Sequence, residues 1–301
     1  MTKVSGESAL ENTEVHFLHS EYVQDDFRIC IARPLTKLPD GIKLSVVYVL
    51  DANTNFGLVS DIVRAGEMAG RLAYVVGIGY RVNSFPSDIF VKRSRDFTPT
   101  PSLLFDNLGG AMVGVPDVRI STGGATLFLE FIRKELKPYI ESLLQLDSPD
   151  NTLIGMSLGG LFCVWTLFNQ PDTFQRYLAC SPSLWWDNDV VFKYEKKWAE
   201  ENEDLLARVF IAAGDEERHE KVAPKIEAAA PEIRPLLASF RNAAGRHMLA
   251  EHVEDLIERL KKRNYESLHI SGRIFPEETH ETVYPSALVR GLAALFPIAI
   301  E

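Results

Sequence analysis

One decapeptide constrains the fold of this chain more than any other feature. Residues 151–160 read Asn-Thr-Leu-Ile-Gly-Met-Ser-Leu-Gly-Gly, so an apolar strand, a Gly-x-Ser-x-Gly turn and an apolar helix follow one another without a spacer. Glycines at 155 and 159 let the strand and the helix approach this tight turn without a Cβ clash. The turn lifts the hydroxyl of Ser157 above the edge of a sheet, near the positive end of the helix. The segment therefore predicts a sheet with a nucleophilic serine at the carboxyl end of one strand.

Strand-like and helix-like patterns alternate along the rest of the chain. The continuous apolar runs at 44–50 and 72–78 are typical of strands covered on both faces. Further strands are predicted at 15–18, 27–32, 152–155, 177–180, 209–213 and 268–270, and helices at 55–70, 127–144, 158–168 and 286–295. We expect Pro138 to kink or divide the second of these helices. The alternation predicts an α/β fold, a doubly wound, mostly parallel sheet with helices on both faces.

We divide the chain into a polar tail, 1–14, and one domain, 15–301. Hydrophobic residues make up 46% of the 301 and charged residues 25%, which is an ordinary globular composition. Within the domain, 80–122 is rich in Pro, Gly, Ser, Asp and Arg and shows little periodicity, so we expect an irregular loop beside the site. Charged helical insertions are predicted around 188–203 and 220–263.

The charge balance and the cysteines argue against several classes of protein. The 32 Lys and Arg against 42 Asp and Glu give a net charge of −10 with no basic run, so we expect no nucleic acid partner. Cys30, Cys163 and Cys180 lie in apolar stretches, where we expect buried thiols rather than a disulfide framework. Residues 1–14 hold no apolar segment and no run is long enough to span a bilayer, so we expect a cytoplasmic protein with no membrane partner.

A serine hydroxyl becomes a nucleophile only when a base takes its proton, and behind an elbow of this kind the base follows in the chain. His280 fits best, because it lies in a loop between the last predicted strand and the last predicted helix. We interpret His247 and His252 as solvent-facing helix residues and His269 as a packed strand residue. His219 lies in a charged segment.

The acid and the oxyanion donors should come from the neighbouring strand ends. Asp215, Glu216 and Glu217 follow the 209–213 strand, and at least one is expected to orient His280. The amide of Leu158 should face the oxyanion, with a second amide from Ala52 or Asn53 in the loop after 44–50. An Asx turn that caps the next helix is equally compatible with that loop.

No motif indicates a metal or a cofactor. The run Gly-Ile-Gly at 77–79 follows a strand but lacks the third glycine and the immediate helix of a dinucleotide-binding fingerprint. There is no phosphate-binding loop, and the paired histidines lack a convincing set of metal ligands. We therefore expect a small-molecule substrate, no cofactor and no metal.

Several motifs resemble, in order, those of the putative-esterase family of α/β-hydrolases. They are Val-Tyr-Val-Leu-Asp-Ala-Asn at 47–53, Val-Gly-Ile-Gly-Tyr at 76–80, Arg-Ser-Arg-Asp-Phe-Thr-Pro at 93–99, the elbow at 155–160, Ser-Pro-Ser-Leu-Trp-Trp at 181–186 and Thr-His at 279–280. Within the family the chain is most similar to the branch of IroE-like and ferri-bacillibactin-type siderophore esterases, over about residues 15–297. One departure is Ala52, which stands where that branch commonly has glycine.

The resemblance implies an α/β-hydrolase fold and a serine esterase with Ser157 as nucleophile and His280 as base. A Gly-x-x-acid pattern, common in this fold, favours Glu217 as the acid, with Asp215 as the alternative. An acyltransferase on the same fold and a non-catalytic binding protein are the competing functions. The ester itself, siderophore lactone or simple acyl ester, is left open.

The resemblance also implies which segments border the substrate pocket. They are the 80–122 segment, which starts at Tyr80, the pair Trp185 and Trp186, and the helices around 188–203. A place in the core is an equal alternative for the two tryptophans. Arg93 and Arg95 could hold an anionic group of the substrate. Ion pairs with Asp88 or Asp96 at the surface are an equal alternative for the two arginines.

Overall fold

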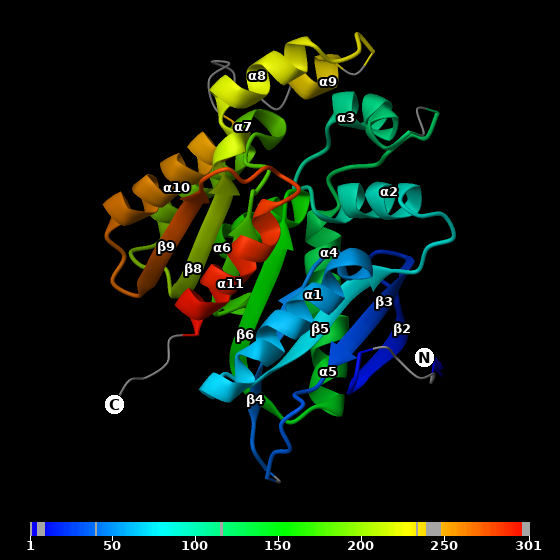
Figure 1. The fold of residues 1–301 in the computed structure, drawn as a ribbon, viewed down its shortest axis with the longest axis vertical. Coiled ribbons are helices and arrows are strands. Elements are labelled where there is room, and N and C mark those ends of the chain that lie inside the picture. The colour runs from blue at the N-terminus through cyan, green and yellow to red at the C-terminus, as the bar shows by residue number, and fades with distance from the viewer. Residues whose placement is uncertain are drawn as a thin grey trace.

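The computed structural model describes residues 2–4, 10–39, 41–114, 117–232, 234–238 and 248–296. Within them a nine-stranded sheet runs in the order β1-β2-β3-β5-β4-β6-β7-β8-β9 (Figure 1). The strands are β1 (Thr2–Val4), β2 (Thr13–Ser20), β3 (Asp25–Ala32), β4 (Leu44–Val49), β5 (Ala73–Tyr80), β6 (Leu146–Met156), β7 (Arg176–Cys180), β8 (Ala207–Gly214) and β9 (Leu268–Phe275). The pairs β1/β2, β2/β3 and β3/β5 are antiparallel, and all pairs from β5/β4 to β8/β9 are parallel. The predicted mostly parallel sheet is confirmed.

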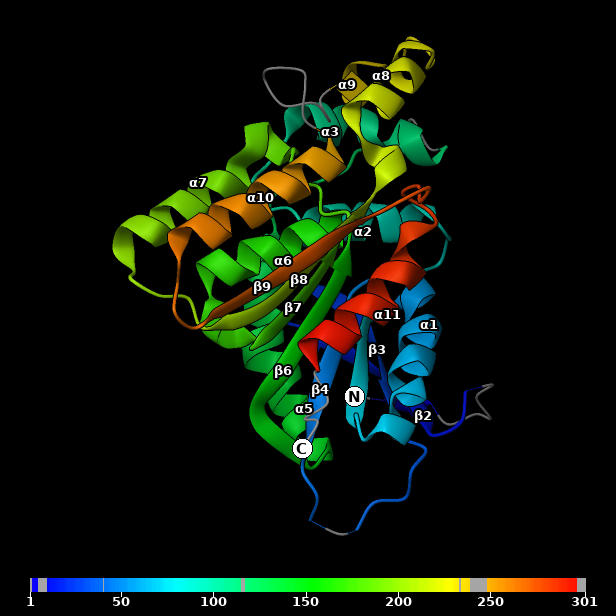
Figure 2. The same ribbon diagram turned by 60° about the vertical axis from the view of Figure 1, so that its left-hand side comes forward.

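Helices cover both faces of this sheet (Figure 1, Figure 2). One face carries α1 (Ala52–Ala65) and α11 (Val283–Leu295). The other carries α4 (Ala125–Phe131), α5 (Lys137–Leu143), α6 (Leu158–Asn169), α7 (Trp186–Glu201) and α10 (Leu249–Arg263). A π-helical turn (Ile132–Leu136) joins α4 to α5 just before Pro138, which is the interruption expected from a residue without an N–H.

The strand β4 shows how the two faces build two cores. All six of its residues are buried, as its continuous apolar run predicts. Val46 and Tyr48 pack into the core under α4 and α6, whereas Val47 and Val49 pack under α1 and α11. Because side chains alternate along a strand, only a run that is apolar at every position can serve both faces.

The expectation of an irregular segment at 80–122 is wrong. The segment forms α2 (Ser87–Asp96), α3 (Leu103–Leu108) and a 3-10 turn (Gly109–Val113). Charged residues hide the helix α2 in the sequence, because its buried positions are Ile89, Ser94 and Asp96 rather than an apolar stripe. With α8 (His219–Glu227) and α9 (Arg234–Ala238), α3 lies beyond the carboxyl ends of the strands (Figure 1).

The structure also bears on several smaller expectations. The three cysteines are buried, as predicted. Of the stretch set apart as a polar tail, residues 2–4 pair with β2 as strand β1. The strands β6 and β9 are longer than their apolar runs, because exposed and polar residues extend them. In the described part of the chain, no helix has the length and apolar character that a bilayer crossing requires.

Candidate active site

Ser157 occupies the sharp turn between β6 and α6. Its backbone has φ 59 and ψ −119, a conformation that non-glycine residues rarely adopt. A Cβ at Gly155 would overlap the carbonyl of Gly159, so the strand can approach the helix only because residue 155 has no side chain. At Gly159 itself a Cβ would have ordinary contacts at 3.5 Å. The close approach predicted for both glycines therefore applies to Gly155 alone.

The backbone of Ser157 is held from two neighbouring segments. Its N–H donates to the carbonyl of Cys180 at 2.9 Å, and its carbonyl accepts from the N–H of Ser183 at 3.0 Å. The Oγ atom lies 3.4 Å from Oγ of Ser183. The end of β7 thus fixes the elbow in place while the hydroxyl lies at the surface of a cavity that is described below.

His280 lies in the loop between β9 and α11 and contacts Glu217, which ends the 3-10 turn (Asp215–Glu217) after β8. Nδ1 of His280 lies 2.6 Å from Oε1 of Glu217. The side chain of Glu217 is 4% exposed and that of His280 is 36% exposed. In a neutral imidazole that donates from Nδ1 to this carboxylate, Nε2 is the remaining acceptor.

The loop after β8 and the loop after β9 come into contact at Gly214, where there is no side chain to keep them apart. A Cβ at Gly214 would overlap the carbonyl of Glu278, and the N–H of Glu216 donates to that same carbonyl at 3.0 Å. The parallel register of β8 and β9 places Gly214 opposite Phe275, so both loops leave the sheet side by side. This contact brings the third residue after Gly214 within reach of His280.

Asp215 and Glu216 point elsewhere. Asp215 accepts from Arg218 at 2.8 Å and from Lys221, and these hydrogen bonds lower the pKa of Asp215. Glu216 accepts from Lys221 at 2.8 Å. Of the three acids considered, Glu217 is the one whose carboxylate contacts His280.

The loop after β4 has its unusual residue one position earlier than the motif suggests. Asp51 is left-handed, with φ 53, whereas Ala52 is the first residue of α1 and has no need for a glycine conformation. The amides of Ala52 and Leu158 each begin a helix, so neither belongs to a helical hydrogen-bond ladder. The side chain of Asn53 binds the backbone of Tyr80, donating to its carbonyl at 2.9 Å and accepting from its N–H at 2.7 Å.

Asp51 does not form the Asx turn that was considered as an alternative for this loop, because its side chain makes no capping bond. Its two oxygens accept from Nε and Nη2 of Arg93 at 2.8 and 2.9 Å. Arg93 Nη2 also lies 3.4 Å from the carbonyl of Met156, and the carboxylate of Asp51 raises the pKa of Arg93 against the effect of burial. Arg93 therefore ties the loop after β4 to the residue before Ser157.

Neither Arg93 nor Arg95 forms the surface ion pair with Asp88 or Asp96 that was considered as an alternative. Arg93 binds Asp51 rather than Asp88 or Asp96. Arg95 does bind Asp96, at 2.6 Å, but that carboxylate is fully buried and burial raises its pKa. Arg95 is not among the side chains that line the cavity, so we correct its expected contact with a substrate.

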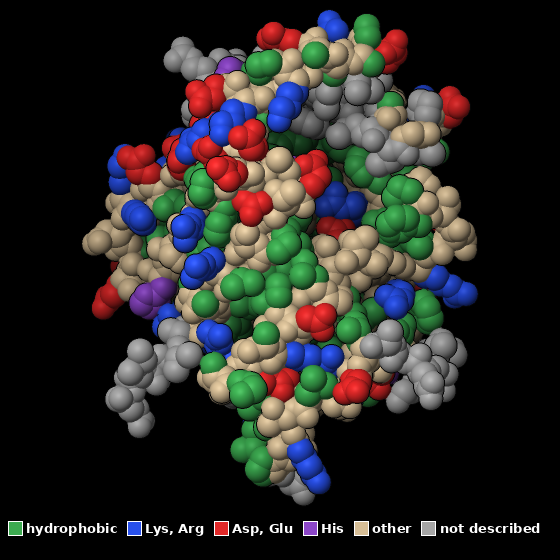
Figure 3. Space-filling view, viewed as in Figure 1, with side chains coloured by type: hydrophobic (Ala, Val, Ile, Leu, Met, Phe, Trp, Pro, Cys, Tyr) green, Lys and Arg blue, Asp and Glu red, His purple; other side chains and the backbone are tan. Residues whose placement is uncertain are grey.

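A cavity of about 350 Å³ opens over Ser157 and His280. It is lined by Phe90, Arg93, Phe105, Ser157, Leu158, Ser183, Trp185, Glu216, Glu217, Val222, Lys225, Met248, Leu249, Thr279, His280 and Glu281. Its walls come from α2, α3, α8, α10 and the loops at the carboxyl edge. The space-filling view shows this face hollowed beneath α3 and α8 (Figure 3).

Of the expected aromatic walls, Trp185 lines the cavity and Trp186 does not. Trp186 is 1% exposed, and its Nε1 donates to the carbonyl of Thr100 at 3.1 Å. Tyr80 is also a core residue, 1% exposed and packed against Phe27. The helices around 188–203 add no lining side chain in the described residues. We therefore correct the expectation of a substrate contact for Trp186 and Tyr80.

Some residues at the site were not singled out from the sequence. Ser181, Ser183, Phe90, Phe105 and Lys225 all contact Glu217, Ser157 or the cavity. The serines lie in the Ser-Pro-Ser motif, which was a usable signal. The phenylalanines lie in the segment predicted to be irregular, and Lys225 lies in a charged helix, so pattern alone could not find them.

Two of the remaining histidines differ from their interpretation. His252 is buried rather than solvent-facing, with Nδ1 2.8 Å from the carbonyl of Met248 and Nε2 3.0 Å from Asp189. His269 is exposed on β9 rather than packed. His247 lies outside the described residues.

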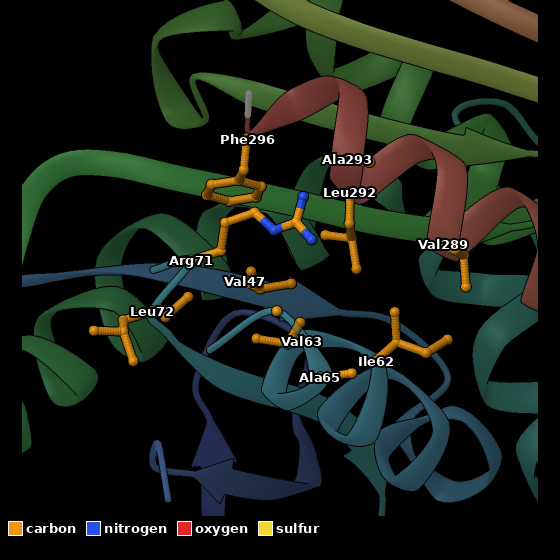
Figure 4. A pocket seen from close by; sticks show the side chains of 12 residues that line it. Val47, Ile62, Val63, Ala65, Arg71, Leu72, Val289, Leu292, Ala293 and Phe296 are labelled. Atoms are coloured by element: carbon orange, nitrogen blue, oxygen red, sulfur yellow. The ribbon is translucent and has the colours of Figure 1, made fainter. Parts of the chain in front are cut away.

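A second pocket, of about 180 Å³, lies between α1 and α11 near the amino ends of β4 and β5. Figure 4 shows apolar side chains converging from both helices, with Arg71 beside Phe296. It contains no serine, histidine or acid, so it does not compete with the cavity over Ser157. In the ranges that the structure describes, no three His, Cys, Asp or Glu side chains are grouped as a metal site would require.

Comparison with known proteins places these features in context. Residues 116–269 match the model of the family described as Putative esterase. Ferri-bacillibactin esterase BesA of Bacillus subtilis (strain 168) is 35% identical over 223 residues, which are 70% of this chain and 73% of BesA.

Solved structures agree over nearly the whole chain. The BES protein from Bacillus cereus superposes with a TM-score of 0.74 at 29% identity, covering 97% of this chain and 98% of that one. An IroE-like serine hydrolase from Shewanella oneidensis gives a TM-score of 0.70 at 25% identity, covering 93% of this chain and 78% of that one. The fold is therefore that of the α/β-hydrolases.

Proposed function

Because this chain belongs to the Putative esterase family and is a carboxylic-ester hydrolase, we propose that it cleaves its ester through an acyl-enzyme on Ser157. One observation carries the mechanism: the 2.6 Å hydrogen bond between His280 and the buried Glu217, beside a strained elbow serine on the same cavity. This is the set of groups that acyl transfer needs, namely a nucleophile, a base and an acid that orients the base.

The proposed reaction uses these groups in two half-reactions. Oγ of Ser157 attacks the ester carbonyl while Nε2 of His280 takes the hydroxyl proton. The negative oxygen of the tetrahedral intermediate accepts from the amides of Leu158 and Ala52, which begin two helices. His280 then gives its proton to the leaving alcohol, and a water molecule that His280 deprotonates releases the acid.

Glu217 supplies the fixed negative charge. Its hydrogen bond to Nδ1 selects the tautomer in which Nε2 can accept a proton. It also stabilises the imidazolium that forms during each half-reaction. Burial of Glu217 keeps water from competing for this hydrogen bond.

The substrate class that the cavity supports best is a siderophore ester with aromatic groups. BesA, the relative with 35% identity, is named as a ferri-bacillibactin esterase. In this chain Phe90, Phe105 and Trp185 supply flat apolar walls for rings. Lys225 adds a cation at the same cavity, which suits an anionic iron-bound ligand.

A labelling and turnover experiment tests the proposal. The wild type and Ser157→Ala are incubated with a fluorophosphonate probe, and the modified peptide is identified by mass spectrometry. Both are then assayed on acetyl to octanoyl esters and on a catecholate trilactone, with and without ferric iron.

We expect labelling at Ser157 and a higher kcat/KM for the trilactone than for the simple esters. Labelling at another residue overturns the nucleophile, and a preference for the simple esters overturns the siderophore substrate. Transfer of the acyl group to an added alcohol, in preference to water, would make the protein an acyltransferase instead.

A further inference from the structure

Ser181, the first residue after β7, combines two features that the mechanism above does not use. Its backbone is left-handed, with φ 41, and its side chain is fully buried. Its N–H donates to the carbonyl of Ala212 on β8 at 2.6 Å. A non-glycine residue in this conformation is disfavoured unless its surroundings hold it there.

We propose that Ser181 is a positioning residue for Glu217, whose hydroxyl holds the carboxylate in the orientation that faces His280. Oγ of Ser181 donates to Oε2 of Glu217 at 2.6 Å. The inference rests on the proposed role of Glu217 as the acid of the site.

The carboxylate of Glu217 receives three hydrogen bonds, and they are unevenly shared. Oε1 accepts from His280, whereas Oε2 accepts from Ser181 and from the N–H of Gly214 at 2.7 Å. The last torsion of a glutamate side chain is broad, so a single donor would leave the carboxylate free to turn. Two donors from different strand ends, β7 and β8, hold Oε2 and so aim Oε1 at the imidazole.

The strained backbone supports a role for the hydroxyl itself. Glycine would adopt φ 41 without a steric cost and would make the same bond to Ala212. It would also leave Glu217 without the donor from β7. A serine at position 181 therefore has a strained backbone, but it makes one buried hydrogen bond to the carboxylate of Glu217 that a glycine could not make.

Two substitutions separate the hydroxyl from the strain. Ser181→Ala removes the hydroxyl and keeps the Cβ, whereas Ser181→Gly removes both. We expect both to lower kcat by about 10- to 100-fold, the usual effect of losing a hydrogen bond to a charged group, with KM within about twofold. The melting temperature should be higher for Ser181→Gly than for Ser181→Ala, because glycine relieves the strain. Full activity in Ser181→Gly would overturn the proposal, because the hydroxyl would then not be needed to orient Glu217.

A double-mutant cycle shows whether Ser181 acts through Glu217. In the Glu217→Ala background there is no carboxylate to orient, so we expect Ser181→Gly to lower kcat no further. Losses that multiply in the double variant would overturn the inference, because they would mean that Ser181 acts on the fold or on another group. Full activity of Glu217→Ala would instead overturn the proposed acid, which is a separate failure.

Discussion

The loops at the two ends of the parallel sheet solve the same backbone problem with different residues. At the amino ends of β4, β5 and β9, the left-handed positions belong to Gly41, Gly70 and Asn264, all exposed. At the carboxyl ends of β4, β6 and β7, the left-handed residues are Asp51 with φ 53, Ser157 with φ 59 and Ser181 with φ 41. Glycine and asparagine tolerate this conformation well, whereas serine does not.

The left-handed residues at the carboxyl ends of β4, β6 and β7 all contribute to the site through their side chains. Glycine would also suit the left-handed positions at the carboxyl ends of the strands. Steric preference alone therefore does not explain why Asp or Ser stands there. Each of the three exceptions uses its side chain: Asp51 binds Arg93, Ser181 binds Glu217, and Ser157 carries the hydroxyl proposed as nucleophile. At these three residues the positive φ therefore accompanies a side chain with a part in the site, although other non-glycine residues, such as Gln24 and Glu277, also have positive φ.

The largest expected effect tests this comparison at Ser157. Ser157→Ala should lower kcat by about 10⁵- to 10⁶-fold, since the residues of a catalytic set act as a unit. Ser157→Gly should lose as much activity yet melt at a higher temperature than Ser157→Ala, because glycine relieves φ 59. Steady-state kinetics and thermal unfolding measure both, with Ser142→Ala on the exposed side of α5 as the control. Equal melting temperatures would show that the elbow is not strained.

The next effect compares two neighbours in the same loop. Glu217→Gln should lower kcat by orders of magnitude, up to about 10⁴-fold, because the imidazole loses the partner that selects its tautomer. Asp215→Asn keeps the shape of a residue that pairs with Arg218 and Lys221, so it should change kcat by no more than about threefold. Initial-rate measurements at saturating substrate decide, and the reverse order of effects would transfer the role to Asp215.

A smaller effect concerns stability at Asp51. Arg93→Met should lower the free energy of unfolding by about 3 kcal/mol, because it leaves the carboxylate of Asp51 buried without its partner. The double variant Arg93→Met with Asp51→Asn should recover part of that loss, since asparagine tolerates φ 53 and carries no charge. Urea unfolding of both variants measures the difference. A double variant less stable than Arg93→Met would show that the ion pair is not what holds the loop.

Local patterns were sufficient for most strands and for three residues that line one cavity, namely Ser157, Glu217 and His280. The elbow at 151–160, the apolar run of β4 and the loop position of His280 are each readable within a few residues. Glu217, favoured by its distance from Gly214, is the acid that contacts His280. These features depend on short-range rules of turn and strand, which a single sequence contains.

Contacts between distant segments were not readable. Arg93 was matched to nearby acids, yet its partner Asp51 lies 42 residues away. Ser181 and Glu217 are 36 residues apart, and the buried partner of His252 is Asp189 in another helix. Helix α2 was missed because its buried positions include Ser94 and Asp96, so no apolar stripe marks the helix. The burial of Asp96 depends on its ion pair with Arg95, which the sequence pattern does not show.

The smallest expected effect concerns the amino ends of the strands. There, a side chain at a left-handed position should lower the free energy of unfolding without changing activity. Gly70→Ala should lower the free energy of unfolding by about 1 kcal/mol, because φ is 74 although nothing lies within 4 Å of the new Cβ. Gly57→Ala, inside α1 and with an ordinary 3.7 Å contact to Leu10, should raise it by about 0.5 to 1 kcal/mol. Urea unfolding resolves the two signs, and kcat should be unchanged in both. If Gly70→Ala were as stable as the wild type, positive φ would carry no cost at this end, and the contrast with Asp51, Ser157 and Ser181 would lose its physical basis.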